Sequence, residues 1–398
     1  MTAAAPALRR EVEAVGLISA AHFLSHFYQL ALPPLFILIR DDIGISFLAL
    51  GSTIAAYNIA TAVLQTPIGF LVDRIGARGV LIAGLAVNAA AMAAAGLAES
   101  YWAMMAAMMA AGVGNAVFHP ADFALLSSSV DDRRLGRAFS VHSLSGSLGF
   151  AAAPVFMLFM ASVWDWRTAL IAAGAAGLAL ACVMPAFSGS IRDNRARERK
   201  QRSGDWTLLF DRTILSFFGF YALSAAAGAG ISGFSVVAFI AIYGASPELA
   251  GGILTAFYLL TGLGVAAGGY IADRSHRPDA VLGICYAAAA CALIAVATGA
   301  LAFWLVAAAF CLAGVFRGIV NPSRDVLLKR LTPAGAVGTV FGFVTTGFNV
   351  GLGTAPVLYG WMMDLGRPDA VFWIAAGFTV LTIGIVFAAR RPVAGPAV

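Results

Sequence analysis

Charged residues are scarce in this sequence. Only 11% of its 398 residues are Asp, Glu, Lys or Arg, whereas 61% are hydrophobic. A soluble domain carries about a quarter charged residues, so this chain cannot cover a water-facing surface of its size. The composition excludes an ordinary soluble globular protein and favours a chain whose solvent is lipid.

Cysteine is also rare, and the motifs of several function classes are missing. The four cysteines lie inside apolar runs without a C-x-x-C pair, which predicts buried apolar side chains and no disulfide or zinc site. No Walker motif, nucleophile–base pair or metal-ligand spacing stands out. We therefore expect neither an enzyme nor a metal or other cofactor, and no use of ATP.

Basic residues exceed acidic ones and give a formal net charge of +5. They occur in short loops between apolar runs and form no continuous stripe, so nucleic acid is not an expected partner. The expected partners are a small-molecule substrate, protons and the lipid bilayer.

Long apolar runs are what the sequence does contain. A spanning helix needs about 20 mostly apolar residues, and the chain offers about twelve such runs. We expect an all-α membrane protein with about twelve transmembrane helices in two six-helix bundles. The expected spans are 14–39, 47–72, 79–98, 101–127, 136–161, 167–188, 212–242, 249–272, 279–299, 301–327, 336–363 and 369–389.

The distribution of Lys and Arg predicts the orientation of these spans. Alternate connections contain most of the basic residues, and the opposite connections contain only Arg40, Arg167 and Arg367. Under the positive-inside rule this places both termini in the cytoplasm of a bacterial-type inner membrane, which requires an even number of spans.

One polar stretch near the middle of the chain divides it. Residues 189–211 predict a cytoplasmic linker between an N-terminal six-helix bundle, 1–188, and a C-terminal bundle, 212–398.

The two halves contain an internal repeat. Residues 111–155 align without a gap with residues 313–357, so that Gly112 meets Gly314 and Pro120 meets Pro322. Six helices repeated in one orientation imply a pseudo-twofold axis along the membrane normal. Such proteins bind substrate near the midplane and transport it by alternating access.

The segment after the second expected span contains a motif. Residues 69–79, GFLVDRIGARG, resemble the loop signature G-x-x-x-D-R/K-x-G-R/K-R/K of the major facilitator superfamily, with glycine in place of the last basic residue. The resemblance covers essentially the whole chain. It implies a gating latch formed by Asp73, Arg74 and Arg78, and a protein that works as a monomer.

A second segment narrows the resemblance. Residues 114–121, GNAVFHPA, resemble the fourth-helix segment of the fosmidomycin-resistance-type exporters, in which His22 also has a counterpart. Those relatives carry an acid directly after His-Pro and another one turn after the first-helix His. Here Asp122 comes one place later and His26 replaces the first-helix acid. The resemblance implies efflux.

Polar residues within the spans are few, so each is informative. His22, His26 and Gln29 form one stripe at helical spacing, and Asn115, His119 and Asp122 form another. These stripes predict either cavity walls or helix-packing contacts. The residues expected to carry protons are His22, His119, Asp122 and His142. Those expected to line the substrate site are His26, Gln29, Asn115, Tyr57 and Asn349.

The repeat places Arg317, Asn321 and Arg324 opposite Asn115, His119 and Asp122. Arg317 falls near mid-membrane, where a guanidinium suits a carboxylate, phosphate or phosphonate; the alternative is a buried structural ion pair. We expect Arg317 and Asn321 in the substrate site. Arg324 and Asp325 are expected at a gate, where Arg324 meets Asp122 across the two halves.

Together these features predict a secondary transporter of a small organic solute, anionic or zwitterionic, exported in a proton-coupled cycle. Proton-coupled uptake of a metabolite anion is the alternative. A non-transporting membrane receptor is a different class, and the loops are too short to favour it.

Overall fold

The computed structural model describes residues 4–191, 209–332 and 337–388, and every regular element in these ranges is a helix. The predicted linker falls largely outside them. The helices are α1 (Ala4–Gln29), η1 (Pro33–Leu35), α2 (Phe36–Ile43), α3 (Phe47–Ile75), α4 (Ala77–Gly96), α5 (Tyr101–Asn115), α6 (Phe118–Ser129), α7 (Asp132–Val163), α8 (Trp166–Phe187), η2 (Ser188–Ser190), α9 (Arg212–Tyr243), α10 (Pro247–Arg274), α11 (Pro278–Ala297), α12 (Phe303–Leu331), α13 (Val337–Asp364) and α14 (Ala370–Ala388).

Many of these helices are suited to a membrane. Among the described residues, eleven helical segments are long and apolar enough to cross a bilayer, and Ala370–Ile385 is a shorter apolar helix where the last span is expected. The prediction of an all-α chain with many spans is confirmed. The count of twelve stays a prediction.

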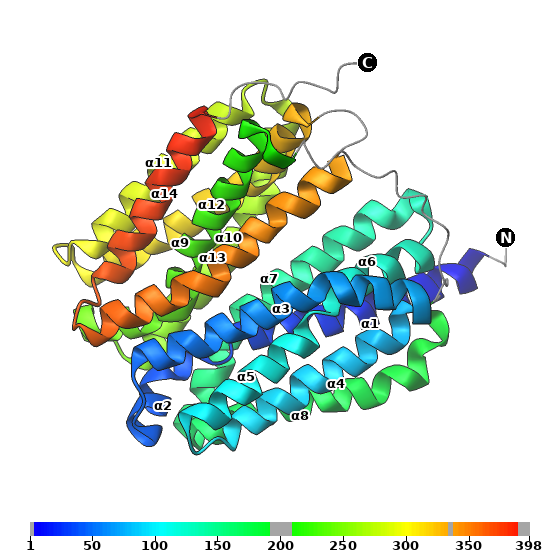
Figure 1. Ribbon diagram of the computed structural model, residues 1–398, viewed down its shortest axis with the longest axis horizontal. Helices are drawn as coiled ribbons and strands as arrows, with labels where there is room; N and C mark the ends of the chain where they lie inside the picture. The colour runs from blue at the N-terminus through cyan, green and yellow to red at the C-terminus, as the bar shows by residue number, and fades with distance from the viewer. Residues whose placement is uncertain (1–3, 192–208, 333–336, 389–398) are drawn as a thin grey trace. The chain divides into compact units, whose positions relative to one another are not determined.

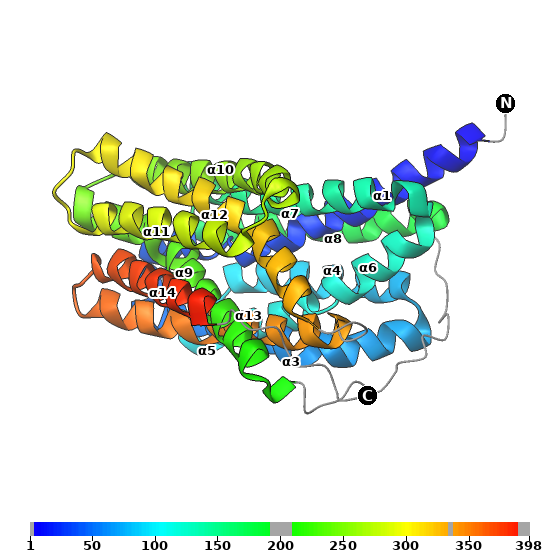
Figure 2. The ribbon, with the colours of Figure 1, turned by 90° about the horizontal axis from the view of Figure 1, so that it is seen from above.

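The chain divides into two compact units. Unit 1 comprises Met1–Ile45 and Ser52–Arg199, and unit 2 comprises Ser46–Gly51 and Lys200–Val398. Within each unit the long helices run side by side (Figure 1 and Figure 2).

The same packing pattern occurs inside both units. In unit 1, α1 packs on α7, and α4 packs on α5 and α8. In unit 2, α9 packs on α13, and α11 packs on α12 and α14. The contact of α1 with α7 corresponds to that of α9 with α13. The contacts of α4 with α5 and α8 correspond to those of α11 with α12 and α14, as the internal repeat predicts.

Glycines of the repeat make close helix contacts possible. A Cβ on Gly112 would clash with the Tyr57 carbonyl group, and a Cβ on the repeat partner Gly314 would meet the Phe257 carbonyl oxygen at 2.7 Å. Only glycine therefore permits these two contacts without a shift of the backbone.

Gly76, inside the loop signature, has a different role. Its φ of +98° lies in the left-handed region, where a side chain is strained, and it joins α3 to α4. This glycine of the signature is needed for a tight turn.

Two predicted spans are interrupted in the structure. The first helix ends at Gln29, ahead of Pro33 and Pro34, which begin η1. The expected continuous span 101–127 is split at Ala116 and Val117 into α5 and α6. Pro120 has no amide hydrogen, and its ring would clash with the Ala116 carbonyl group in an unbroken helix.

Candidate functional site

Four of the five histidines in the chain gather in unit 1. They come from α1, α6 and α7 and surround one aspartate. We call this group the histidine cluster: His22, His26, His119, Asp122 and His142.

Asp122 is the centre of the histidine cluster and is 0% exposed. Its Oδ2 atom lies 3.0 Å from His22 Nδ1 and 3.6 Å from His142 Nε2. The two imidazole rings stack with 3.7 Å between their centroids. Among the described residues, the ion-pair partners of Asp122 are these imidazoles and no Lys or Arg. The centre is thus a buried carboxylate without a permanent cation beside it.

The hydrogen bonding of the histidine cluster is incomplete. Within the described part of the chain, Asp122 Oδ1, both ring nitrogens of His142 and His26 Nδ1 are buried without a hydrogen-bond partner. Buried polar groups are nearly always satisfied in proteins, so these atoms point to a species that completes the network.

The other two histidines flank the centre. The His26 ring lies 4.5 Å from the His22 ring and stands edge-on to Phe150. His119 is exposed, and its ring lies 5.9 Å from that of His22. His119 therefore connects the buried centre with the surface of unit 1.

The break between α5 and α6 positions two members of the cluster. His119 and Asp122 both lie in the first turns of α6, directly after the break. Asn115, the last residue of α5, accepts a hydrogen bond from Ser25 Oγ at 2.9 Å and donates one to Thr61 Oγ1 at 3.3 Å. Side chains of α1 and α3 thereby hold the end of α5.

A glycine leaves room for the imidazoles of α1. A Cβ on Gly146 of α7 would lie 3.0 Å from His22 Nε2 and 3.1 Å from His26 Cδ2. Because nine in ten real Cβ contacts are longer, a larger residue here would displace both rings.

Three members of the histidine cluster could hold a metal ion. One ligand atom each from His22, Asp122 and His142 lies within 4.8 Å of the other two, and all three residues are buried. The sequence pattern singles out all three residues as proton carriers but does not predict a metal site, because they lie on three helices and share no short spacing.

Unit 2 contains a half-buried arginine whose Nη1 atom is buried. Arg317 on α12 donates from Nη2 to the Ser224 carbonyl oxygen at 3.1 Å, and its Nη1 is buried without a hydrogen-bond partner among the described residues. Tyr258 and Tyr359 lie within electrostatic reach of it. No carboxylate forms an ion pair with Arg317 in the described ranges. The alternative of a structural ion pair therefore finds no partner there.

Arg324, one turn further along α12 than Asn321, does have an acidic partner. Its Nε donates to Asp325 Oδ1 at 2.8 Å, and Tyr221 Oη donates to the same oxygen at 2.9 Å. The guanidinium also lies over the Tyr221 ring, 4.4 Å from the centroid. The expected meeting of Asp122 with Arg324 stays a prediction.

The remaining predicted residues are dispersed. Asn321 and Asn349 are half-buried in unit 2, on α12 and α13, and Gln29 is half-buried at the end of α1. Tyr57 is only 2% exposed, inside unit 1. Of the latch residues, Asp73 and Arg74 are exposed in the last turns of α3, and Arg78 is half-buried in the first turn of α4.

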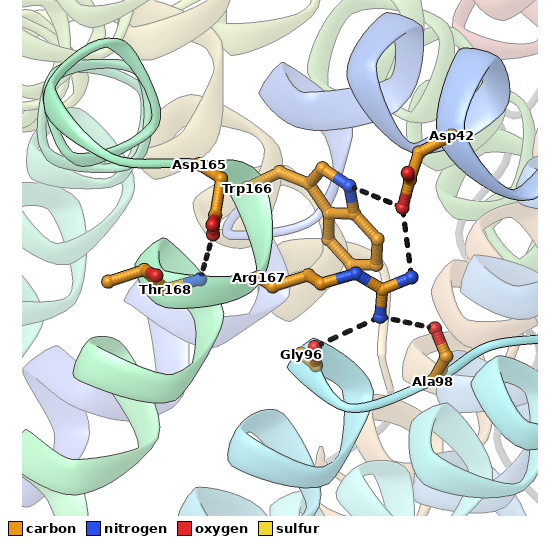
Figure 3. Close-up of polar contacts among 7 residues, drawn as sticks. All are labelled: Asp42, Gly96, Ala98, Asp165, Trp166, Arg167 and Thr168. Atoms are coloured by element: carbon orange, nitrogen blue, oxygen red, sulfur yellow. Dashed lines mark hydrogen bonds and ion pairs between the residues drawn. The ribbon is translucent and has the colours of Figure 1, made fainter.

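A polar cluster that the sequence did not predict joins α2, the end of α4 and the start of α8 (Figure 3). Asp42 Oδ2 accepts hydrogen bonds from Arg167 Nη2 at 2.9 Å and from Trp166 Nε1 at 3.2 Å. Arg167 Nη1 also donates to the carbonyl oxygens of Gly96, at 3.3 Å, and Ala98, at 2.7 Å. This outer cluster ties α2 and the end of α4 to the start of α8.

Asp165 caps the same end of α8. Its carboxylate accepts the Thr168 amide hydrogen at 2.6 Å, and this hydrogen bond holds the pKa of Asp165 below its ordinary value (Figure 3).

Comparisons of sequence identify related proteins over nearly the whole chain. The Major Facilitator Superfamily profile matches residues 18–243 and again 217–397. The fosmidomycin resistance protein of Escherichia coli (strain K12) is 23% identical over 387 residues, which cover 94% of this chain and 92% of that protein. The inner membrane transport protein YajR of the same organism is 24% identical over 402 residues, covering 97% and 85%.

Solved structures with the same fold are also transporters. A bacterial homolog of the human lysosomal transporter Spinster, in an inward-facing and unoccupied conformation, superposes with a TM-score of 0.80 at 14% identity, covering 98% of this chain and 99% of that one. The nucleoside transporter NupG gives a TM-score of 0.78 at 15% identity, covering 96% and 100%.

Proposed function

The chain belongs to the major facilitator superfamily and is a multi-pass membrane transporter, not an enzyme; from this premise we propose that it exports a small organic anion or zwitterion by alternating access, driven by the proton gradient. We further propose twelve spans in two six-helix bundles, 1–188 and 212–398, joined by a cytoplasmic linker at 189–211. In this proposal the protein is a monomer in a bacterial inner membrane with both termini in the cytoplasm.

The proposal that the substrate is anionic or zwitterionic rests on the hydrogen bonding of Arg317. Its guanidinium has one backbone carbonyl as a partner, while the whole of Nη1 stays unpaired. Nη1 is a buried charged donor without a partner among the described residues, so an anionic ligand that pairs with it gains the energy of a charge-assisted hydrogen bond. A carboxylate or phosphate-type group fits this geometry.

Export is supported by the fosmidomycin resistance protein, whose name describes resistance and which matches 94% of this chain. In this proposal an ion gradient, and not ATP, is the source of energy. A proton is the first ion to test. The specific assignment of protons to His22, His119, Asp122 and His142 stays a prediction.

A ligand-binding experiment tests the anion site. Purified protein is screened by thermal shift against small carboxylates, phosphates and phosphonates, and the Arg317→Ala and Arg317→Lys variants are compared with it. Arg330→Ala, which removes an exposed cation from the end of the same helix, is the control. We expect a stabilising anion whose effect is lost in R317A and kept in R330A. Stabilisation that survives in R317A would contradict the proposal.

Transport in inverted membrane vesicles tests the direction and the coupling. Accumulation of the identified anion inside inverted vesicles, abolished when an ionophore collapses the pH gradient, is the expected result. Accumulation only in right-side-out vesicles would instead establish uptake, and transport that is indifferent to the ionophore would exclude protons.

A further inference from the structure

The centre of the histidine cluster places potential metal ligands around a carboxylate that has no Lys or Arg partner among the described residues. It combines a fully buried carboxylate with two buried imidazoles, and no Lys or Arg pairs with the carboxylate in the described part of the chain. An isolated buried carboxylate is expensive, so a cation at this place would be stabilised.

The distances between the three ligand atoms suit a small metal ion. Tetrahedral Zn²⁺ with bonds of about 2.0–2.1 Å requires ligand atoms about 3.3 Å apart. The observed distances from Asp122 Oδ2 are 3.0 Å to His22 Nδ1 and 3.6 Å to His142 Nε2, which bracket this value. All three ligand atoms lie within 4.8 Å of one another.

The unpartnered atoms of the same residues point to the same conclusion independently. Both nitrogens of His142 and the Oδ1 atom of Asp122 are buried without a hydrogen-bond partner among the described residues. His142 is 3% exposed and Asp122 is 0% exposed, so bulk water does not satisfy them. An ion bound to Asp122 Oδ2 would also give His142 Nε2, one of these atoms, a partner.

We propose that His22, Asp122 and His142 form a binding site for a divalent first-row transition-metal ion, of which Zn²⁺ is the first example to test. Two imidazole nitrogens and one carboxylate oxygen are the donor set that these ions favour. Mg²⁺ and Ca²⁺ prefer sites made entirely of oxygen and are excluded.

This site is separate from the anion site proposed above. Every ligand of the metal belongs to unit 1, whereas Arg317 belongs to unit 2. A failure of metal binding therefore leaves the anion proposal intact, and the reverse also holds.

Equilibrium dialysis of the full chain tests the proposal. The protein carries no polyhistidine tag, is stripped with a chelator, and is then titrated with Zn²⁺ and, separately, with Mg²⁺. We expect one Zn²⁺ per chain and no comparable binding of Mg²⁺. Asp122→Asn and His142→Gln should each weaken Zn²⁺ binding at least about tenfold, because even loss of a residue that only supports a ligand costs about 10–100-fold.

His276→Gln is the matched control, because His276 is the one histidine outside the cluster and lies exposed between α10 and α11. It should bind Zn²⁺ like the wild type. No Zn²⁺ on the wild type, unchanged binding in both ligand variants, or an equal loss in H276Q would each overturn the proposal.

The visible spectrum of Co²⁺ keeps the test decisive if the ligand variants fail to fold. In the wild type, a three-ligand site with an open position should give the intense bands of four- or five-coordinate Co²⁺. The weak bands of a six-coordinate aqua ion alone would count against the site.

Discussion

Arg317 donates its hydrogen bond to Ser224, and this contact is the counterpart in unit 2 of the bond between Asn115 and Ser25 in unit 1. The equivalence follows from the glycines of the repeat. Gly149 packs against the backbone of Phe23 and Phe27, and its repeat partner Gly351 packs in the same way against Ala222 and Ala226. This register matches Ser25 with Ser224.

The same register matches His22 with Tyr221. His22 contacts Asp122 at 3.0 Å, and Tyr221 lies under the guanidinium of Arg324, the repeat partner of Asp122. Equivalent positions in the repeat therefore hold a carboxylate with imidazoles in unit 1 and, in unit 2, a guanidinium that is already paired with Asp325.

The first prediction concerns Gly146, which leaves space for two imidazoles. Gly146→Ala places a Cβ about 3 Å from His22 and His26 and should displace both rings. We expect Zn²⁺ binding and transport to fall by about tenfold. The free energy of unfolding should fall by about 1 kcal/mol.

Gly136→Ala is the control for this change. It lies on the same helix, and a Cβ there has no neighbour within 4 Å. Alanine should raise helix stability by about 0.5–1 kcal/mol without an effect on binding. Equal loss of function in both variants would show that α7 tolerates no added methyl group, and the role of Gly146 would be refuted.

The second prediction concerns the outer cluster. Arg167→Ala removes hydrogen bonds to Asp42 and to two carbonyl groups at the end of α4. We expect the free energy of unfolding to fall by about 1–2 kcal/mol, because charge-assisted hydrogen bonds contribute more than neutral ones. Unfolding in detergent, followed by denaturant or heat, measures the change.

Arg367→Ala provides the comparison for Arg167. Arg367 forms an exposed ion pair with Asp369 and is a basic residue of the same predicted side of the membrane. Exposed ion pairs contribute little to stability, so this variant should unfold close to the wild type. If the two variants were equally stable, the carbonyl contacts of Arg167 would contribute nothing measurable.

The third prediction is a pH dependence at the start of α8. The pKa of Asp165 is lowered in the folded state by the Thr168 amide, so its charged form stabilises α8. The contribution is present above the ordinary Asp pKa of about 3.9 and is lost as the pH falls through the lower folded value. Asp165→Ala should cost about 1 kcal/mol at neutral pH and less in acid.

Asp165→Asn separates the charge from the cap. Asparagine also caps helices but does not titrate, so the unfolding free energy of D165N should lack the acid-dependent component seen in the wild type. Thermal unfolding over a pH series measures both variants. If the difference in stability between the wild type and D165A stayed constant into acid, the charge of Asp165 would not be the cause of the stabilisation.

Much of the fold follows from the sequence because lipid imposes a simple rule. Apolar runs of about 20 residues must be helices in a membrane, since no other segment satisfies its own backbone there. The repeat of Gly112 in Gly314 corresponds to close helix contacts that both units make. The interruption of the fourth run was missed, because Pro120 and Pro322 look alike in sequence while α12 continues through Pro322.

The site was predictable only in part. Helical spacing placed His22 with His26, and His119 with Asp122, but the contacts of Asp122 with His22 and His142 join helices far apart in sequence. Single-helix patterns carry no information on such contacts. The outer cluster was missed for the same reason: Asp42, Gly96 and Arg167 share no sequence pattern, and two of the acceptors are backbone carbonyl groups.

The fourth prediction tests whether the break between α5 and α6 builds the histidine cluster. Pro120→Ala restores the missing amide hydrogen and removes the ring that opposes the Ala116 carbonyl group. We expect α5 and α6 to approach one continuous helix, which turns Asp122 away from His22 and His142. Zn²⁺ binding should weaken by at least about tenfold, while stability is retained because alanine is a better helix former than proline.

Pro322→Ala is the matched change in unit 2, where the helix is already continuous. It should leave Zn²⁺ binding unchanged, and so distinguish the loss of the break from a general effect of removing a proline. Dialysis and thermal unfolding of both variants give the answer. Full Zn²⁺ affinity in P120A would mean that contacts such as Ser25 with Asn115, rather than the proline, hold the break open. Reduced affinity in P120A alone would identify Pro120 as the residue that positions Asp122.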